Sequence, residues 1–517
     1  MKKRTIRNLK LAYLLILSLL IFCITLEISL FSIRSSNDVW WHLKTGKVIY
    51  ETKNLPAHDI FTQEGYKYEW VNHEWLSELI FYIVYLIGDE NLKVLIFFKA
   101  IVLGLTYLYL FYILNKNIKS PIIAFISTLF ALWIGKHTFY VRPPIFTYLC
   151  LVIFFSLIIN YLAKKKLSKT LVVALFFLML IWTNLHGGAI LGLILSFFLI
   201  LDSIFYLLQK KESISYLKNN LFIFIIVLLG ILLNPWGYKT LLLPFKVMQD
   251  SYLPKIIYEL QPPELKYLPQ LKIFIPLFFI SLMGKDKPFR IFDMLSVAFF
   301  TYESLSSVRH LPLFGLICGY YFGLSFWQAF KVNIKKVKGS FKFVLLLFCI
   351  FLYIHLVKIH LPFLKEFLNN KLGYIKENYP EGVCTYIIIH KIPGPYFNDE
   401  NFSGYLIWRL SPEYGKIFTD VRFDIFKSDF LPYTFAVKEG YTKGKYTLQK
   451  TLEKFKPNAI ILYKNANGCK ILSKMNKWKI AYKDDKFVLF VRKNILDKNN
   501  NVLYNKKLKE VEKDCEK

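Results

Sequence analysis

Residues 37–79 read NDVWWHLKTGKVIYETKNLPAHDIFTQEGYKYEWVNHEWLSEL, and this polar stretch separates the first hydrophobic segment from all the others. It interleaves acidic residues and histidines with tryptophans, namely Asp38, His42, His58, Asp59, His73, Glu74, Trp40, Trp41, Trp70 and Trp75. A long polar loop beside apolar helices is a common place for the functional residues of a membrane enzyme. We therefore interpret residues 34–91 as a first large loop outside the hydrocarbon and as the first place to look for a site.

Hydrophobic segments dominate the rest of the first 361 residues, and the 517-residue chain is 55% hydrophobic and 18% aromatic. Apolar runs recur at residues 11–33, 92–114, 121–134, 144–162, 170–182, 190–208, 221–233, 273–283, 291–300, 311–330 and 341–359. About 20 apolar residues cross a bilayer as a helix. The sequence therefore predicts a polytopic α-helical membrane domain over residues 1–361, with about 11 transmembrane helices. The short run at 75–87 either spans the membrane or lies along its surface.

Basic loops between the apolar runs set the expected topology. If residues 75–87 do not cross the membrane, these loops all fall on one side, namely Lys116, Lys119, Lys164, Lys165, Lys166, Lys169, Lys210, Lys211, Lys285, Lys287, Arg290 and residues 331–342. Basic loops remain in the cytoplasm. We therefore expect a multi-pass protein of the plasma (inner) membrane with a cytoplasmic N-terminus and an extracytoplasmic C-terminal domain. The same topology brings most polar residues near span ends to the outer face.

The strongly basic balance of the chain has its source in these loops and in the tail. The formal net charge is +31, and the lysines lie in short runs between apolar segments rather than in a nucleic-acid-binding motif. Anionic lipid headgroups account for them, so we expect membrane lipids and no nucleic acid as partners. The seven cysteines form no CxxC pair, so the sequence indicates neither a zinc site nor a disulfide framework.

Charged, alternating sequence replaces the apolar runs after residue 361. We expect strands at 383–389, 406–408, 416–419, 459–463, 479–482 and 487–491, and helices at 447–455 and 471–478. This alternation predicts a small soluble α/β domain over residues 362–495, followed by a basic tail at 496–517. Asp420, Arg422 and Asp424 alternate after one predicted strand, and would form an ion-pair network or contact a ligand.

Asp38 and His42 are the first candidates for chemistry in the polar loop. Asp38 follows the first span directly, so its carboxylate lies at the membrane surface, where burial beside Trp40 and Trp41 would suit a general base. The alternative is a helix N-cap, a role that aspartate also favours. Asp38 and His42 are one helical turn apart and would share a face.

Other polar side chains of the loop are candidates for lining the same site. They are His58, Asp59, His73 and Glu74, which with Asp38 and His42 would supply nitrogen and oxygen ligands to a divalent metal. Their spacing matches no fixed metal motif, and hydrogen bonding to the backbone is the commoner use of such pairs in a loop. The sequence therefore establishes no cofactor and leaves a divalent metal open.

Arg142, Arg309 and His310 lie at the outer ends of predicted spans. Arginine suits phosphate because its guanidinium fork donates two hydrogen bonds and keeps its charge. A lipid-linked phosphate or pyrophosphate would present its charge at this depth. The alternative is snorkelling to phospholipid headgroups. That alternative fits Arg309 and His310 less well, because they interrupt an apolar stretch and follow Glu303.

Two further segments face the same side in the expected topology. Residues 184–188 read NLHGG, in which the glycines favour close helix packing and His186 is either a site-lining residue or a packed, hydrogen-bonded histidine. Residues 234–271 are long, proline-rich and amphipathic. They would form interfacial helices that either cover a site as a lid or simply connect two spans.

These features together resemble a known superfamily. An aspartate just after the first transmembrane helix, a long external loop and many helices with basic inner loops resemble the GT-C glycosyltransferases, membrane enzymes that use polyprenyl-phosphate- or polyprenyl-pyrophosphate-linked sugars. More closely, DVWWHLKTGKVIY, LPAHDIFT, WVNHEWLSELIFY, NLHGG, NPWG, VRHLPLF and KIFTDVRFDIF resemble a largely uncharacterised bacterial set within that superfamily. The resemblance covers most of the chain.

The resemblance implies roles for three residues. Asp38 matches the first-loop acidic residue that engages the acceptor or a metal, Asp59 occupies a second acidic position, and Arg309 resembles the late basic residue that binds lipid-linked phosphate. The chain departs from the commonest pattern because no acidic residue stands beside Asp38 or two positions on, which leaves a metal undecided. It also lacks the WWD-type motif of enzymes that N-glycosylate proteins.

The sequence and its resemblance together predict an inverting hexosyl- or pentosyltransferase at the outer face of the plasma membrane. Asp38 would be the base or the acceptor-positioning residue with Asp59 and His42 assisting, and Arg142, Arg309 and His310 would hold the donor phosphate. The residues that would line the site are His58, His73, Glu74 and His186. The donor would be a polyprenyl-phosphate-linked sugar, and the acceptor a glycan, a lipid or a protein. The alternatives are a transporter or flippase of a lipid-linked substrate and a non-catalytic membrane scaffold.

Overall fold

A computed structural model of the chain describes residues 2–31, 37–250, 253–264, 266, 268–283, 289–335, 376–422, 425 and 428–499, with single positions at 354, 358, 361, 365 and 369. Nearly all of the predicted last span at 341–359 and of the predicted tail at 496–517 lies outside the described residues, as does Asp424. The structure divides into two compact units. We call Met1–Ser36 with His73–Tyr374 the bundle unit, and Asn37–Asn72 with Ile375–Lys517 the sheet unit.

This division departs from the linear domain order expected from the sequence. The sequence predicts one loop of the membrane domain over residues 34–91, whereas the structure splits that stretch after Asn72. Its first half, Asn37–Asn72, packs with the C-terminal residues, and its second half begins the part of the bundle unit that starts at His73. The candidate residues of the polar loop therefore belong to two different units.

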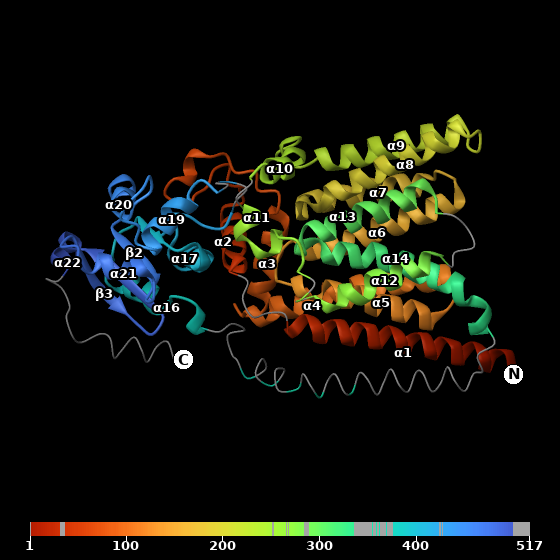
Figure 1. Ribbon diagram of the computed structural model, residues 1–517, viewed down its shortest axis with the longest axis horizontal. Helices are drawn as coiled ribbons and strands as arrows, with labels where there is room; N and C mark the ends of the chain where they lie inside the picture. Colours follow the sequence, from red (N-terminus) through yellow and green to blue (C-terminus); the bar gives the residue numbers. More distant parts are fainter. Residues whose placement is uncertain are drawn as a thin grey trace. The chain divides into compact units, whose positions relative to one another are not determined.

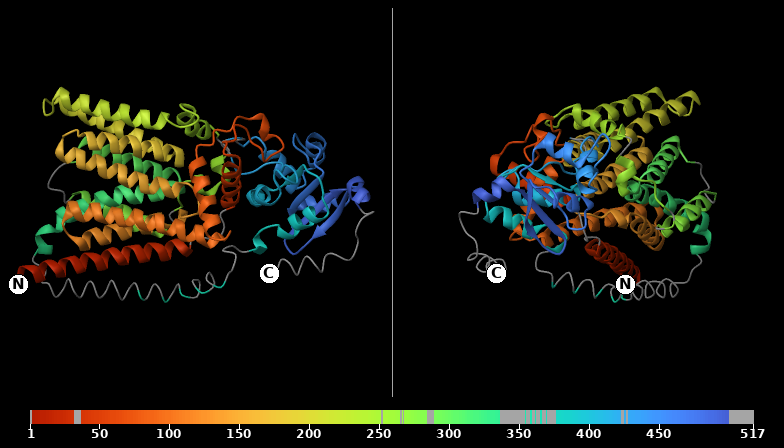
Figure 2. Two further views of the ribbon diagram at one scale, coloured as in Figure 1. Left: turned by 180° about the vertical axis from the view of Figure 1, so that it is seen from behind. Right: turned by 60° about the vertical axis from the view of Figure 1, so that its left-hand side comes forward.

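The bundle unit is helical, and its long helices run side by side in each view (Figures 1 and 2). Its α-helices are α1 (Lys2–Phe31), α3 (Trp75–Ile87), α4 (Leu92–Ile118), α5 (Pro121–Gly135), α6 (Pro144–Lys164), α7 (Lys169–Leu185), α8 (Ile190–Leu208), α9 (Ile214–Leu232), α10 (Lys239–Met248), α11 (Leu253–Ile256), α12 (Pro269–Met283), α13 (Ile291–Ser306) and α14 (Leu311–Lys335). Single 3-10 turns join several of them, namely η2 (Lys136–Thr138), η3 (Gly187–Ala189), η4 (Tyr258–Leu260) and η5 (Val308–His310).

Six stretches of the described residues are long and apolar enough to cross a membrane. They are Leu11–Leu30, Leu92–Ile118, Pro121–Thr138, Pro144–Lys164, Gly187–Leu208 and Ile214–Leu232. The shorter apolar helices are Trp75–Ile87, Lys169–Leu185 and Gln270–Leu282. These helices are those of a multi-pass membrane protein, as the sequence predicts. The larger number of crossings expected from the apolar runs stays a prediction.

Helix α7 shows how the apolar runs divide between the core and the outside of the bundle. Val173, Phe177 and Ile181 are each half exposed, and their i, i+4, i+8 spacing places them on one face. Met179 and Trp182 are fully buried. A helix with large apolar side chains on both faces suits a position between a protein core and lipid.

Small residues let α5 and α14 approach closely. A Cβ atom added at Gly315 would lie 2.6 Å from the backbone oxygen of Ala131, and one at Gly319 would lie 3.0 Å from the Ala131 Cβ atom. No larger side chain fits at Gly315 without moving a helix, which is the role that small residues commonly have between membrane helices.

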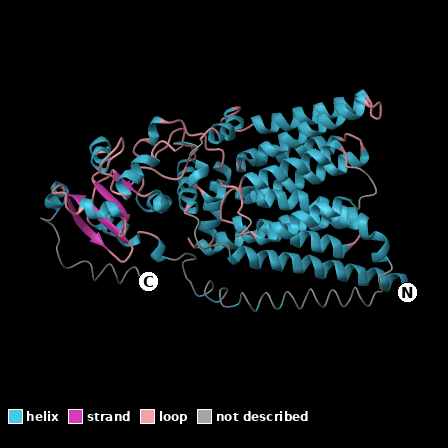
Figure 3. Ribbon diagram, viewed as in Figure 1, coloured by secondary structure: helices cyan, strands magenta, loops and turns pink. Residues whose placement is uncertain are grey.

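The sheet unit combines short helices with one small sheet (Figure 3). Its helical elements are α2 (Asp38–Thr52), η1 (Gly65–Lys67), η6 (Lys376–Asn378), α16 (Glu381–Ile389), η7 (Glu400–Phe402), α17 (Ser403–Leu410), α19 (Leu431–Lys438), α20 (Leu448–Phe455), α21 (Asn467–Leu472) and α22 (Lys493–Asn499). The strands β1 (Tyr396–Asn398), β2 (Ala459–Tyr463), β3 (Trp478–Lys483) and β4 (Phe487–Arg492) lie in the order β1-β2-β4-β3. The β1–β2 pair is parallel, and the other two pairs are antiparallel.

The α/β class, the last three strands and the helix at 447–455 follow the prediction, but four predicted elements are wrong. Residues 383–389 and 406–408 lie in helices α16 and α17 rather than in strands, and residues 416–419 contribute only isolated bridges at Ile417. The helix predicted at 471–478 ends at Leu472 in α21, and β3 begins at Trp478. Short buried apolar runs carry no periodicity that separates helix from strand, which explains the first two errors.

The first-loop segment extends this sheet. Thr62 forms a parallel bridge with Ile417, which forms another with Tyr396 at the start of β1. The Ile417 N–H donates to the Phe61 carbonyl at 3.2 Å, and the Gln63 N–H donates to the Ile417 carbonyl at 2.8 Å. The loop is therefore part of the fold of the sheet unit and not a flexible connection.

Candidate functional site

Asp38 and His42 lie on α2 in the sheet unit, with the one-turn spacing that the sequence predicts. Asn37 rather than Asp38 holds the N-cap position, and it makes no side-chain cap hydrogen bond. Asp38 lies in the first turn, where a negative charge interacts favourably with the helix dipole. His42 is buried, and its ring centroid lies 3.7 Å from that of Trp41. Asp38 is partly exposed, whereas His42 is packed inside the unit.

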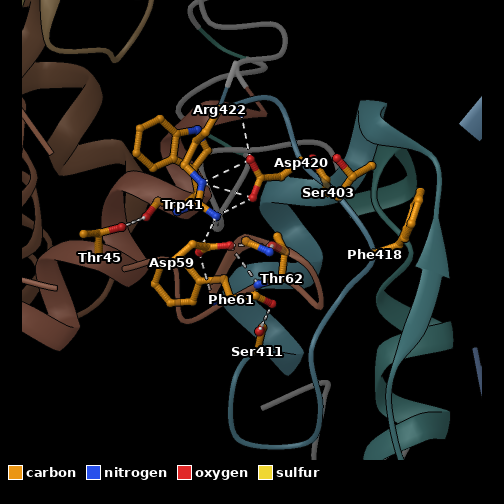
Figure 4. Close-up of polar contacts among 12 residues, drawn as sticks. Trp41, Thr45, Asp59, Phe61, Thr62, Ser403, Ser411, Phe418, Asp420 and Arg422 are labelled. Carbon is orange, nitrogen blue, oxygen red and sulfur yellow. Dashed lines mark hydrogen bonds and ion pairs between the residues drawn. The ribbon is translucent and has the colours of Figure 1, made fainter. Parts of the chain in front are cut away.

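Asp59 lies at the centre of a buried ion cluster with Arg422 and Asp420 (Figure 4). The Arg422 Nη2 atom lies 2.7 Å from Asp59 Oδ1. The Arg422 Nε atom lies 3.1 Å and 3.0 Å from the two carboxylate oxygens of Asp420. All three side chains have 0% exposure. Of the two alternatives that the sequence leaves for Asp420 and Arg422, the structure forms the ion-pair network.

The rest of the Asp59 carboxylate is also occupied. The Phe61 N–H donates to Oδ1 at 3.0 Å, and Oδ2 accepts from the Thr62 N–H at 3.1 Å and from the Thr62 hydroxyl. Burial alone would raise the pKa of Asp59, but the Arg422 charge and these hydrogen bonds together lower it below its usual range. The carboxylate is therefore ionised, enclosed and fully engaged in holding the loop.

Aromatic rings close the cluster around Arg422. Its guanidinium carbon lies 4.6 Å from the ring centroid of Trp70, 5.2 Å from that of Phe61 and 5.8 Å from that of Trp41. A desolvated cation against aromatic faces gains from cation–π attraction. Trp41 and Trp70 of the polar loop thus enclose the guanidinium of Arg422, which in turn holds the loop through Asp59.

His58 has the backbone role that the sequence allows. It is exposed, and its Nδ1 atom lies 3.2 Å from the Tyr68 carbonyl oxygen. Within the described residues, no group of three or more histidine, cysteine, aspartate or glutamate side chains has the arrangement of a metal site.

His73, Glu74 and His186 come together in the bundle unit. The Glu74 Oε1 atom lies 3.7 Å from His73 Nε2 and 3.4 Å from His186 Nε2. The three side chains retain 15–22% exposure, in contrast to the closed Asp59 cluster. Three residues predicted to line a site are thus neighbours in space.

The partners of His186 determine which ring nitrogen carries the proton. The Gly188 N–H donates to Nδ1 at 3.0 Å, so Nδ1 is an acceptor and the Thr147 hydroxyl, 2.8 Å away, also donates to it. The Thr147 oxygen in turn accepts from the Trp182 indole N–H at 2.9 Å. The proton of the neutral ring therefore lies on Nε2, the atom that faces Glu74.

The ring of His186 is neutral at ordinary pH. Burial, followed by the positive groups of His73 and Arg309, holds the pKa of His186 well below its usual range. The ring is therefore not a cation for phosphate.

Further contacts join the same two segments of chain. The Trp75 indole N–H donates to Asn184 Oδ1 at 2.8 Å, and the Ser77 hydroxyl donates to the Leu185 carbonyl at 2.6 Å. Gly187 lies directly beside the ring of His73, two residues before the start of α3. Residues 73–75 (HEW) and 184–188 (NLHGG) therefore form a single cluster, which we call the HEW–NLHGG cluster.

Arg142 is paired with a carboxylate of the segment after α9. Its Nη1 atom lies 2.8 Å from Glu259 Oε2, and both side chains are about three-quarters buried. The Ser307 hydroxyl donates to the Glu259 carbonyl at 2.7 Å, and the Val308 N–H donates to the Gln261 carbonyl at 3.0 Å. The segment predicted to form interfacial helices contains α10, α11 and η4, and η4 is bonded to the start of η5. Its position at the membrane interface stays a prediction.

Arg309 and His310 follow in η5. Arg309 lies within electrostatic range of Arg142, Glu259 and Glu74. His310 Nδ1 lies 2.8 Å from Glu303 Oε2, so this histidine is directed toward its own carboxylate. The bundle unit thus joins the two predicted arginines to Glu74 in one charged region, and gives His310 a separate partner.

Two buried residues of this region escaped sequence reasoning. Lys99 in α4 is fully buried, and its ammonium donates to the carbonyls of Ser29 and Phe139 at 2.7 Å each. A lysine inside an apolar run is a signal that could have identified it. Thr147 gives no such signal, because a lone threonine in an apolar helix is ordinary.

Sequence comparison does not place the chain in a family. No family model matches it, and no curated protein matches it.

Structural comparison does find similar folds. Oligosaccharyltransferase AglB from Archaeoglobus fulgidus, solved with an inhibitory peptide and a dolichol-phosphate, has a TM-score of 0.56 and 12% identity, over 88% of this chain and 70% of AglB. The apo form of the Archaeoglobus fulgidus enzyme has a TM-score of 0.54 and 12% identity, over 86% of this chain and 69% of the enzyme. ArnT from Cupriavidus metallidurans, bound to undecaprenyl phosphate, has a TM-score of 0.48 and 10% identity, over 93% of this chain and 97% of ArnT. The fold is therefore GT-C-like, as the sequence motifs predict.

Proposed function

We propose that this protein is a membrane glycosyltransferase that transfers a sugar from a polyprenyl-phosphate-linked donor to an acceptor at the outer face of the plasma membrane. The observation that carries the proposal is the fold similarity to AglB over 88% of this chain, because that enzyme was solved with a dolichol-phosphate. Dolichol phosphate belongs to the same chemical class as the proposed leaving group.

The donor phosphate would bind to Arg142 and Arg309, with His310 nearby in sequence. Two guanidinium groups within electrostatic range of each other repel unless anions lie between them. Glu259 supplies one such anion to Arg142 at 2.8 Å. A phosphate would take that place through two parallel hydrogen bonds and would be stabilised further as it leaves with a second negative charge.

The acceptor side of the proposal concerns the sheet unit. Asp38 is partly exposed in the first turn of α2 and remains the candidate base or acceptor-positioning residue. Asp59 and His42 would assist it indirectly, since both are buried in the same unit as Asp38. In an inverting transfer, the acceptor oxygen would attack the anomeric carbon as its bond to the phosphate oxygen breaks.

Native mass spectrometry of the full-length protein with added undecaprenyl phosphate tests the donor class. We expect the wild type to retain the lipid and the double variant Arg142→Ala, Arg309→Ala to lose it. Lys166→Ala is the matched control, because Lys166 is an exposed basic residue that snorkelling would also explain. Equal retention by the double variant and the control would contradict the proposal and favour a scaffold that holds bulk lipid. Retention by the wild type together with lipid movement across vesicles but no sugar transfer would instead support a flippase.

A further inference from the structure

Glu74 occupies a helix N-cap position without using it. It precedes α3 directly, yet its side chain makes no cap hydrogen bond. Glutamate is not among the residues that favour this position. The carboxylate instead turns to the ε nitrogens of His186, at 3.4 Å, and His73, at 3.7 Å. A residue that served only to cap the helix would be serine, threonine, aspartate, asparagine or glycine, and a side-chain cap would point toward the N–H groups of the first turn.

A directed series of hydrogen bonds ends at the His186 ring, whose Nε2 atom lies 3.4 Å from this carboxylate. It runs from the Trp182 indole N–H to the Thr147 hydroxyl, and from that hydroxyl to His186 Nδ1. The Gly188 N–H reinforces the acceptor role of Nδ1. These bonds to Nδ1 fix the orientation of the ring, which keeps its Nε2 atom beside the Glu74 carboxylate.

The backbone around His186 is shaped for this arrangement. A Cβ atom at Gly188 would lie 2.4 Å from the Thr147 hydroxyl oxygen, and one at Gly187 would lie 3.0 Å from the His73 ring. Any side chain at Gly188 would separate Thr147 from His186. Close packing against Thr147 and the His73 ring thus explains why both of these positions in the NLHGG motif are glycine.

The cluster combines fully buried and partly exposed side chains. Thr147 and Trp182 are 2% and 0% exposed, whereas Glu74, His73 and His186 retain 15–22%. The Asp59 carboxylate, by contrast, is fully enclosed and hydrogen-bonded within the fold. A partly exposed carboxylate held beside a fixed array has the geometry of a group that exchanges a proton with a ligand.

We propose that Glu74 accepts the acceptor's proton during sugar transfer, and that His186 and Thr147 are positioning residues that hold its carboxylate. This inference rests on the proposed function. The acceptor O–H bond breaks and its proton passes to a Glu74 oxygen, while the acceptor oxygen forms a bond to the anomeric carbon. The bond from that carbon to the phosphate oxygen breaks, and its electron pair leaves with the polyprenyl phosphate.

The test compares four variants of the full-length protein in native membranes that contain the cell's own lipid-linked sugars. They are Glu74→Gln, Thr147→Val, Thr147→Ser and the control Thr183→Val, which removes a buried hydroxyl of α7 that lies outside the array. The release of polyprenyl phosphate gives the rate, and retention of added undecaprenyl phosphate reports the donor site.

We expect Glu74→Gln to lower kcat at least about 100-fold, which is the usual contribution of a proton acceptor, with undecaprenyl phosphate retention unchanged. Thr147→Val should lower kcat about 10-fold at constant KM, because the ring of His186 can then turn or change tautomer. Thr147→Ser should restore the rate, and Thr183→Val should leave it unchanged. If Thr147 had only a structural role, Thr147→Val would reduce the amount of folded protein and would not lower kcat at constant KM.

Three results would overturn the inference. An active wild type with an equally active Glu74→Gln variant would refute it while leaving the proposed function intact. A wild type that neither retains undecaprenyl phosphate nor releases polyprenyl phosphate would refute both. If Glu74→Gln does not fold, nitrogen-15 spectra of histidine-labelled wild type decide the matter: a protonated Nδ1 on His186 would show that the array does not exist, and a protonated Nε2 would support it.

Discussion

The Asp59 cluster of the sheet unit and the HEW–NLHGG cluster of the bundle unit have similar components and opposite construction. Each contains at least one carboxylate, a nitrogen-bearing partner and tryptophan. In the first, Asp59 and Arg422 have 0% exposure, and aromatic rings surround the guanidinium. In the second, Glu74 and His186 keep 15% and 22% exposure beside the buried Thr147 and Trp182.

This difference separates charges that hold the fold from charges that are available to a ligand. A fully buried ion pair depends on partners inside the protein, and within the described residues only the Nη1 atom of Arg422 lacks one in this cluster. A partly exposed array can exchange water for substrate without that dependence. Residue types alone therefore do not identify the site; the degree of enclosure does.

The largest effect should follow from breaking the closed cluster. Arg422→Met leaves the buried carboxylates of Asp59 and Asp420 facing each other without a cation, and we expect it to destabilise the sheet unit by about 3–5 kcal/mol. Thermal unfolding and limited proteolysis of the full-length protein measure this loss. Arg409→Met is the matched control, because Arg409 pairs with Glu381 but remains 33% exposed. Equal stability of the two variants would show that enclosure does not matter.

Removal of the acidic group from α2 should affect activity and not stability. Asp38 is partly exposed, so Asp38→Asn should lower the rate of transfer by about 100-fold while the melting temperature changes by no more than a degree or two. Glu51→Gln, an exposed change at the other end of α2, is the control. A fully active Asp38→Asn variant would remove Asp38 from the proposed mechanism.

A smaller effect, a gain in affinity for undecaprenyl phosphate, should follow when Arg142 loses its ion pair with Glu259. Glu259 competes with phosphate for this guanidinium, so Glu259→Gln should strengthen undecaprenyl phosphate binding by about 3- to 10-fold. Affinity measured in nanodiscs checks this, with the exposed neighbour Glu264→Gln as the control. Weaker binding by Glu259→Gln would mean that Glu259 positions Arg142 and does not compete with the ligand.

Much of the bundle could be predicted from the sequence because apolar runs of sufficient length leave few alternatives. The runs that became α4, α6 and α8 illustrate this. The sheet unit was harder, since residues 383–389 and 406–408 lie in short helices whose apolar runs carry no clear helical period. Local pattern is informative only where one face of an element differs from the other.

The site was predictable in part, for a related reason. His73, Glu74 and His186 were named from their residue types, and the structure brings them together. The pairing of Asp59 with Arg422 joins residues 363 positions apart, so no local pattern could reveal it. Asp59 therefore looked like a second catalytic acid in sequence, although in the structure it has no surface to offer.

The most direct test of the distinction between the two clusters is the turnover of an Asp59→Asn variant, expressed per folded molecule and measured beside its melting temperature. We expect the melting temperature to fall by several degrees, because Arg422 loses one of its two carboxylates, while turnover per folded molecule stays within about twofold of the wild type. An unchanged melting temperature with turnover reduced more than about tenfold would contradict this account, and would make Asp59 a catalytic acid.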